Sequence, residues 1–292
     1  MQTWGENYWE TYAPVVNWLS VRIMLALTTI HDLDARSMDF ILAFPQAELD
    51  VDIYMELPYS FSNNSDTPVV LKLKKNLYGL KQAAYNWHNM LKTGIEARGF
   101  KPSAIDSCVY LRKDCILLVY VDDCIIISKK NTRVAADLMK SLKDEGFKLE
   151  DEGDLNKFLG VDVQKESDGT IHLKQEHLIQ RFLKLVKITE EEHAKDSPSL
   201  KPVLSKDTGG LERRHTWNYR QAIGMLNYMQ STTRPDIAYA AHQCARFCND
   251  PKLCHERAVR RIGKYLKGTG TSKLGLTFKV AHMERMLGKY EP

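Results

Sequence analysis

The sequence has no long hydrophobic run. Its most apolar stretches are interrupted by Asp or Arg well before the roughly eighteen residues that a membrane-spanning helix needs. The opening residues, MQTWGENYWE, contain Glu and no basic residue, so they do not resemble a secretory signal. We therefore expect an intracellular, non-secreted protein with no membrane partner.

Cysteine is sparse, and no Cys-x-x-Cys pair occurs. The six cysteines do not form the dense framework of a small secreted protein, which favours a reducing compartment. Cys244, Cys248 and Cys254, with His242 and His255, are residue types that bind zinc. Because Cys244 and Cys248 stand one helical turn apart, buried helical cysteines are the favoured interpretation and a zinc site is the alternative.

A strong excess of one charge is also missing. Lys and Arg total 41 against 37 Asp and Glu, and this net charge of +4 is compatible with nucleic-acid binding without selecting it. The 292 residues, 43% hydrophobic and 27% charged, are typical of a folded globular protein. This length allows one large domain or two ordinary ones.

One stretch, Val109–Ser128, contains two acidic residues between apolar segments. The runs Cys115–Val121 and Cys124–Ile127 are short and rich in Val and Ile, which favours strands, and Asp122 and Asp123 fall where a tight hairpin turn is expected. Adjacent carboxylates repel each other, and a hard divalent cation such as Mg²⁺ compensates their charge. By itself, an Asp-Asp pair is also compatible with an ordinary polar turn.

A third carboxylate, Asp39, interrupts another apolar and strand-like run, Ser37–Phe44. An isolated acid there needs a partner or a metal ion. Tyr120-Val121-Asp122-Asp123, with Asp39 far upstream, resembles the palm of reverse transcriptases. The surrounding phrases are similar to the polymerase of copia-type retrotransposons.

This resemblance implies an α+β fold: a reverse-transcriptase palm, with a split βαββαβ antiparallel sheet and helices on one face, followed by a mainly helical thumb or connection region. It implies an RNA-directed DNA polymerase in which Asp39, Asp122 and Asp123 hold two Mg²⁺ (or Mn²⁺) ions for nucleotidyl transfer onto a primer 3′-hydroxyl. The implied partners are an RNA template, a DNA primer and deoxynucleoside triphosphates. The resemblance also implies integrase and ribonuclease H parts of a polyprotein as further partners. It implies a cytoplasmic particle or the nucleus as the location.

The resemblance also suggests a nucleotide pocket. Phe44 matches an aromatic residue of the family that stacks under the sugar and excludes a ribose 2′-hydroxyl, and Leu77-Tyr78-Gly79-Leu80-Lys81-Gln82 resembles a phrase beside that pocket. A core aromatic residue on a strand and an ordinary strand-to-helix turn are the alternatives. The nucleotide-binding residues expected from the resemblance are Phe44, Tyr78, Gly79, Lys81 and Gln82.

Two features depart from the family. Its usual Asp-Val-Lys-Thr-Ala-Phe-Leu-Asn-Gly is Asp39-Phe40-Ile41-Leu42-Ala43-Phe44-Pro45-Gln46-Ala47 here, and the basic finger segment that precedes the palm is not found. A catalytically inactive remnant that folds and binds nucleic acid is therefore the alternative function, and a purely structural α+β protein is a third.

Nucleic-acid contacts are expected at three places. Tyr120 and Val121 precede the acidic pair, and Phe158-Leu159-Gly160 resembles the family's primer grip, with plain strand packing as the alternative. A third group of basic residues lines one face of an expected helix, where it would follow a phosphate backbone or simply face solvent. These residues are Arg257, Arg260, Arg261, Lys264 and Lys267.

Periodicity predicts the remaining elements. Val69–Leu80 alternates apolar residues with lysines, which predicts a strand with one basic face and one buried face, next to a strand at Ile53–Leu57. The predicted helices cover Val15–His31, Gln82–Arg98, Thr132–Glu145, Gln175–Val186, Trp217–Thr233, Arg234–Cys248 and His255–Lys267, and a hairpin joins Asn156–Gln164 to Thr170–Leu173. We expect a palm with partial fingers and the start of the thumb at 1–194, a linker at 195–210, a helical thumb or connection at 211–278 and an unmatched tail at 279–292.

Overall fold

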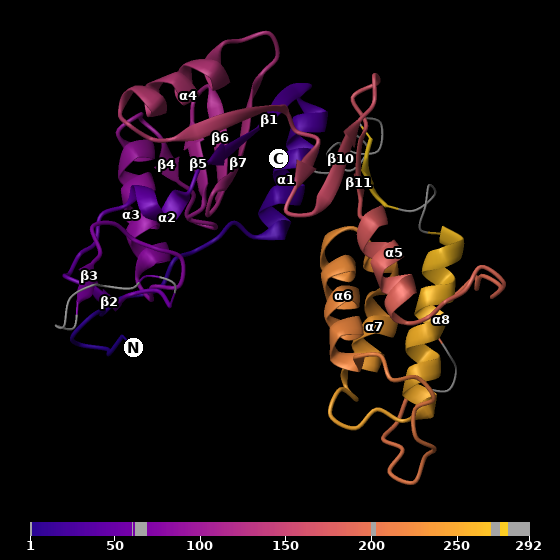
Figure 1. Cartoon of the computed structure of the whole chain (residues 1–292). Coiled ribbons are helices and arrows are strands. Elements are labelled where there is room, and N and C mark those ends of the chain that lie inside the picture. The colour runs from indigo at the N-terminus through magenta and orange to yellow at the C-terminus, as the bar shows by residue number, and fades with distance from the viewer. Residues whose placement is uncertain (1, 60, 62–68, 200–202, 270–274, 280–292) are drawn as a thin grey trace. The chain divides into compact units, whose positions relative to one another are not determined.

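A computed structural model describes residues 2–59, 61, 69–199, 203–269 and 275–279 (Figure 1). The chain forms two compact units, Met1–Leu155 and Asn156–Pro292, which we call unit 1 and unit 2 and describe separately. Most of the predicted tail, residues 280–292, lies outside the described residues.

Unit 1 contains a six-stranded antiparallel sheet in the order β4-β5-β6-β7-β1-β8. β6 and β7 form the predicted hairpin, in which Tyr120 pairs with Asp123. The β-branched residues that favoured strands bury most of β6 and β7. The bounds are β1 Leu33–Phe40, β4 Lys101–Pro102, β5 Val109–Arg112, β6 Cys115–Tyr120, β7 Asp123–Lys129 and β8 Leu149–Asp154.

Helices cover both faces of this sheet, whereas helices on one face were predicted. α3 (Ala83–Glu96) and α4 (Val134–Asp144) share a core with Cys124 and Ile126 of β7. The alternate residues Ile125 and Ile127 are also buried, and α1 (Trp18–Ile30) contacts β1 and runs along that other side (Figure 1). The prediction was wrong on this point because α1 is apolar around most of its surface and needs a sheet face to cover.

β1 ends at Phe40, before the end of the strand-like run predicted at Ser37–Phe44. Leu42 has a left-handed φ of 51° and precedes α2 (Ala43–Gln46), a single helical turn. Phe44 therefore lies on α2, and the alternative that placed it on a strand is wrong.

β2 (Tyr54–Glu56) and β3 (Val70–Lys72) pair only with each other in the described residues. The strand predicted within Val69–Leu80 exists, but it is short and every residue of it is exposed, so the predicted buried face is wrong. The alternation of apolar residues with lysines indicates that the two faces of the strand differ. It does not show that another part of the protein packs against the apolar face.

Unit 2 combines a small sheet with a helical bundle. The sheet order is β12-β11-β10-β9, and the predicted hairpin joins β10 to β11. The elements are β9 Lys157–Phe158, β10 Val161–Lys165, β11 Ile171–Lys174, α5 Glu176–Leu185, α6 Tyr219–Thr232, the short 3₁₀ helix η1 Pro235–Ile237, α7 Ala238–Ala245, α8 Leu253–Thr269 and β12 Leu276–Phe278. The predicted helices are confirmed to within a few residues at each end, apart from Arg234–Cys248, which divides into η1 and α7.

One core joins α5 to α6, α7 and α8. Phe182 of α5 is fully buried with Leu226 of α6 and Ile262 of α8. The predicted boundaries around 195–210 thus fall inside unit 2, on a connection between helices that share a core, and the assignment of the segments to palm and thumb stays a prediction. Among the described residues, no helix is both long and apolar enough to cross a membrane.

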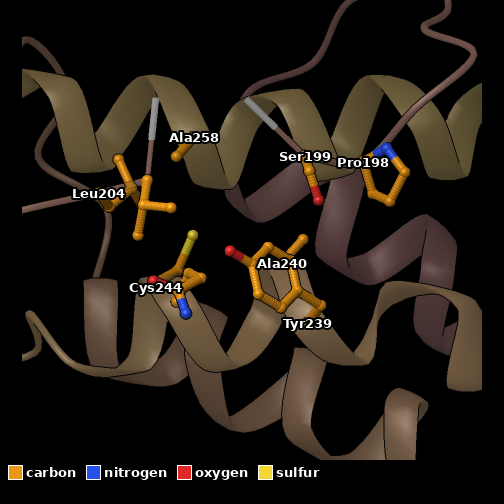
Figure 2. A pocket seen from close by; sticks show the side chains of 9 residues that line it. Pro198, Ser199, Leu204, Tyr239, Ala240, Cys244 and Ala258 are labelled. Carbon is orange, nitrogen blue, oxygen red and sulfur yellow. The ribbon is translucent and has the colours of Figure 1, made fainter. Parts of the chain in front are cut away.

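A small cavity lies beside α7 and α8 in unit 2 (Figure 2). Tyr239, Cys244 and Ala258 line it, and its volume of about 20 Å³ has room for roughly one water molecule. It is too small for an organic ligand.

Candidate active site

The turn between β6 and β7 has an unusual backbone. Tyr120 pairs with Asp123, so Val121 and Asp122 are its two central residues. Val121 has a positive φ of 60°, whereas Asp122 does not. This combination is typical of a type II′ hairpin turn, whose first central residue is usually Gly. A β-branched residue there is strained, so surrounding contacts must hold the turn in place.

The structure places the three predicted acids at the same end of neighbouring strands, although no three His, Cys, Asp or Glu side chains of the described residues converge closely enough to hold a metal ion. Asp39 on β1 pairs directly with Asp123 on β7, which puts both side chains on the same face of the sheet. The backbone N–H of Phe40 donates a hydrogen bond of 3.0 Å to the carbonyl of Asp122, which joins the end of β1 to the turn. All three carboxylates are partly buried.

Burial and repulsion by neighbouring acids raise the pKa of two carboxylates, Asp123 and Asp39. Burial, followed by the negative charges of Asp122 and Asp39, raises the pKa of Asp123 from 3.8 to about 6. Burial and then the charge of Asp122 also raise the pKa of Asp39. Perturbed acids in one cluster are typical of functional sites.

β8 adds two acids that the sequence analysis did not select. Glu150 pairs with Asp39 on the side opposite Asp123, and Glu152 contributes to the raised pKa of both Asp39 and Asp123. Both glutamates are exposed. The run Glu150-Asp151-Glu152 was the available signal, but acidic residues and Gly153 are poor strand formers, so it did not indicate a strand beside Asp39.

A tryptophan that the sequence analysis did not select as a site residue contacts the turn. The indole N–H of Trp87, on α3, donates a 2.8 Å hydrogen bond to the carbonyl of Val121. Its ring packs edge-on against Phe40, with the centroids 5.1 Å apart.

Two of the predicted nucleotide-binding residues lie beside the acids. The rings of Phe44 and Tyr78 are in contact, with 4.7 Å between centroids. Burial, followed by the charges of Asp122 and Asp39, raises the pKa of Tyr78. Tyr78 remains 56% exposed, so its ring is open to a ligand.

The other three predicted residues differ in accessibility. Gly79 is exposed, with φ of 101° and no heavy atom near the position of a Cβ. The Lys81 side chain is exposed, and its backbone N–H donates to Gln2. Gln82 is fully buried, and its amide donates to the carbonyl of Asn7, so this side chain faces the protein interior.

The predicted primer-grip residues belong to unit 2. Leu159 and Gly160 form the two-residue turn between β9 and β10, and both have positive φ, as in a type I′ turn. The Tyr228 hydroxyl donates a hydrogen bond to the carbonyl of Leu159, and Phe158 is buried.

We call the five basic residues predicted along one face of α8, Arg257, Arg260, Arg261, Lys264 and Lys267, the basic stripe. Most of them make contacts within unit 2. Arg260 donates to both carboxylate oxygens of Glu192 at 2.7 and 2.8 Å, and Lys264 lies 3.0 Å from the same carboxylate. Arg261 donates to the carbonyl of Ser197, and Lys267 donates to three carbonyls between 189 and 192. Arg257 is exposed and has no partner among the described residues.

The cysteines do not form a metal cluster in the described part of the chain, where no three His, Cys, Asp or Glu side chains converge closely enough to hold a metal ion. Cys244 is buried in α7 with its pKa raised by burial to about 12, and all six thiols are free. The Cys254 thiol contacts Asp207.

Comparison with known proteins adds a second line of evidence. Residues 1–201 match the family model described as reverse transcriptase (RNA-dependent DNA polymerase). The chain belongs to this family. It is 32% identical over 279 residues to the "Retrovirus-related Pol polyprotein from transposon TNT 1-94" of Nicotiana tabacum, a match that covers 91% of this chain and 21% of that protein.

Two other relatives extend this result. The transposon RE1 Pol polyprotein of Arabidopsis thaliana is 32% identical over 91% of this chain and 18% of its own length. A putative transposon Ty5-1 protein of Saccharomyces cerevisiae is 27% identical over 80% of this chain and 76% of its own. The resemblance to copia-type polymerases is confirmed, and the chain spans about a fifth of the plant polyproteins it matches.

Proposed function

We propose that this chain is the RNA-directed DNA polymerase domain of a copia-type retrotransposon polyprotein, with Asp39, Asp122 and Asp123 as its catalytic carboxylates. The observation that carries the proposal is the direct pairing of Asp39 with Asp123 beside the strained turn that contains Asp122. Two segments far apart in sequence thus supply three acids at one end of the neighbouring strands β1 and β7.

The donor set matches Mg²⁺ or Mn²⁺ in its chemistry. The three groups are hard oxygen ligands. The pKa of Asp123 and of Asp39 is raised first by burial and then by neighbouring negative charge, and a bound cation would offset both effects. When bound, two such ions activate the primer 3′-hydroxyl and stabilise the leaving pyrophosphate. To hold that positive charge at one place, the three carboxylates would have to lie closer together than they do in the described residues.

The fold supports the same proposal. β1, α3, the β6–β7 hairpin, α4 and β8 follow one another along the chain, and their strands lie in the order β6-β7-β1-β8. This order supports the split βαββαβ sheet expected of a polymerase palm. We assign unit 1 to the palm. The incoming nucleotide would lie over the rings of Phe44 and Tyr78, and Gly79 would let the protein backbone approach it closely.

The partners follow from the reaction. The substrates would be deoxynucleoside triphosphates and a DNA primer paired with an RNA template. Integrase and ribonuclease H parts of a polyprotein are the further partners that the copia-type resemblance implies. Lys81, with its exposed side chain, would meet phosphate, and the Leu159–Gly160 turn would contact the primer.

Primer extension on poly(rA)/oligo(dT) with Mg²⁺ or Mn²⁺ tests the proposal. We expect extension by the wild-type chain and its loss in Asp122→Asn. Asp114→Asn is the matched control, because Asp114 lies in the other turn of the same sheet and contacts Arg112 instead of the acids. Equal activity in wild type and Asp122→Asn would contradict the assignment.

Nucleic-acid binding without catalysis is the second candidate function. It is favoured by the α2 turn, where Pro45-Gln46-Ala47 stands in place of the family's Leu-Asn-Gly. Salt-dependent binding of the primer–template with no extension by the wild-type chain would support this candidate, and the absence of both would indicate a structural role.

A further inference from the structure

We propose that Trp87 is a positioning residue of the polymerase site, whose indole N–H fixes the orientation of the Val121–Asp122 peptide and thereby the direction of Asp122 and Asp123. This inference rests on the proposed function. Trp87 would touch neither substrate nor metal ion and would act only through the backbone of the turn.

The hydrogen bond is buried and well formed. Trp87 is only 1% exposed, and its indole nitrogen lies 2.8 Å from the Val121 carbonyl oxygen. The residue lies in the middle of α3, and Leu91 and Ile95 of the same helix are buried in the same core. The donor therefore sits on a rigid element, so it constrains the turn instead of following it.

The bonded carbonyl belongs to the peptide that defines the turn type. Type I′ and type II′ hairpin turns differ mainly by a rotation of their central peptide, which here joins Val121 to Asp122. In this turn Val121 has positive φ and Asp122 does not. Rotation of the peptide would move the Val121 carbonyl away from Trp87 and turn Asp122 toward positive φ, which would redirect its carboxylate.

The same side chain also contacts the strand that carries Asp39. The Trp87 ring packs edge-on against Phe40, the residue that follows Asp39, and the Phe40 N–H donates to the Asp122 carbonyl. Trp87 thus contacts the backbone of the turn that carries Asp122 and the side chain of the residue next to Asp39. A purely space-filling tryptophan would need the ring contact but not the N–H.

Two substitutions separate the N–H from the bulk of the ring. Trp87→Phe removes the donor and part of the ring, and incorporation of 3-benzothienyl-alanine at position 87 replaces the N–H with sulfur while preserving the shape. Trp217→Phe is the matched control, because Trp217 is buried and its indole N–H has no partner in the described structure.

Two measurements on the full chain test the inference. Amide hydrogen exchange of peptides spanning 118–125 reports on the turn, and Mn²⁺ binding followed by electron paramagnetic resonance reports on the acids. For both position-87 variants we expect exchange of this segment to increase and Mn²⁺ affinity to fall about fivefold, the effect of one lost hydrogen bond. Trp217→Phe should leave both unchanged.

The outcomes distinguish this inference from the proposed function. Unchanged exchange at 118–125 in the benzothienyl variant would overturn the role of Trp87, whatever the activity of the chain. Wild-type Mn²⁺ binding no tighter than that of Asp122→Asn would count against the polymerase site, while hydrogen exchange would still decide whether Trp87 holds the turn. If Trp87→Phe does not fold, the isosteric variant carries the test alone.

Discussion

Asp39 of β1 lies directly opposite Asp123 of β7 in a continuous antiparallel ladder that begins at Leu33 and Lys129. This register puts both carboxylates on one face, and a shift by one residue would put them on opposite faces. The buried alternation of β7, with Cys124 and Ile126 toward one core and Ile125 and Ile127 toward the other face, fixes the register. Hydrophobic packing along the strands thus determines where the acids meet.

Asp39 and Glu150 pair with each other across β1 and β8, and they allow a matched comparison of activity. Asp39→Asn removes a proposed metal ligand while keeping its size, and we expect primer extension to fall by at least about 100-fold. Glu150 is paired with Asp39 from the other side but is exposed, so Glu150→Gln should change extension by less than about threefold. Comparable losses in the two variants would show that the whole acidic face acts through its charge alone.

The raised pKa of Asp123 predicts an effect on stability. Its folded-state pKa of about 6 exceeds the ordinary value of 3.8, so unfolding releases a proton, and the free energy of unfolding falls as pH rises from about 4 to 6. Once the pH is well above 6, Asp123 is fully ionised and the loss of stability is complete. We expect Asp123→Asn to gain about 1–2 kcal/mol at pH 8 without divalent cations and almost nothing at pH 4.

Metal addition provides the control for this prediction. If the folded state binds Mg²⁺ as proposed, millimolar Mg²⁺ should stabilise the wild type at pH 8 and reduce the advantage of Asp123→Asn. Denaturant unfolding with and without Mg²⁺ measures both effects. A variant that is less stable than wild type at pH 8 would mean that Asp123 is held by attractive contacts, contrary to the repulsion described here.

Features encoded locally could be predicted from the sequence. The Asp-Asp hairpin followed from two short β-branched runs, and α3, α4 and α5 followed from apolar residues at helical spacing. The family resemblance depended on phrases that are contiguous in the chain, such as Tyr120-Val121-Asp122-Asp123. Each of these signals lies within about twenty residues.

Features that depend on contacts between distant segments could not be predicted. β8 is rich in Asp and Glu and forms because the edge of β1 offers a backbone ladder, so tertiary pairing overrides its weak strand propensity. The bond from Trp87 to Val121 joins residues 34 apart, and a Trp on an apolar helix face does not indicate which carbonyl its N–H reaches. The basic stripe of α8 was placed on one helical face by its spacing, but its neighbours at 186–197 were unknown.

Gly79 provides a test of the backbone beside the proposed nucleotide pocket. A Cβ at this position would meet no other atom, so Gly79→Ala should cost about 1 kcal/mol through its positive φ alone. The control is Gly224→Ala in the exposed interior of α6, which should stabilise unit 2 by about 0.5–1 kcal/mol. Thermal unfolding gives both signs, and a stabilising effect of Gly79→Ala would contradict the described backbone.

The basic stripe of α8 should divide into two functions. Arg260 is hydrogen-bonded to Glu192 and to the carbonyls of Val186 and Lys187, so Arg260→Ala should destabilise unit 2 by about 2 kcal/mol. Arg257 is exposed, and if the chain binds nucleic acid along this face, Arg257→Ala should weaken binding and reduce the slope of log affinity against log salt by about one. Binding titrations at several salt concentrations, beside denaturant unfolding, measure the two effects. A folded Arg260→Ala variant that lowers the salt slope as much as Arg257→Ala would show instead that Arg260 leaves Glu192 to bind phosphate.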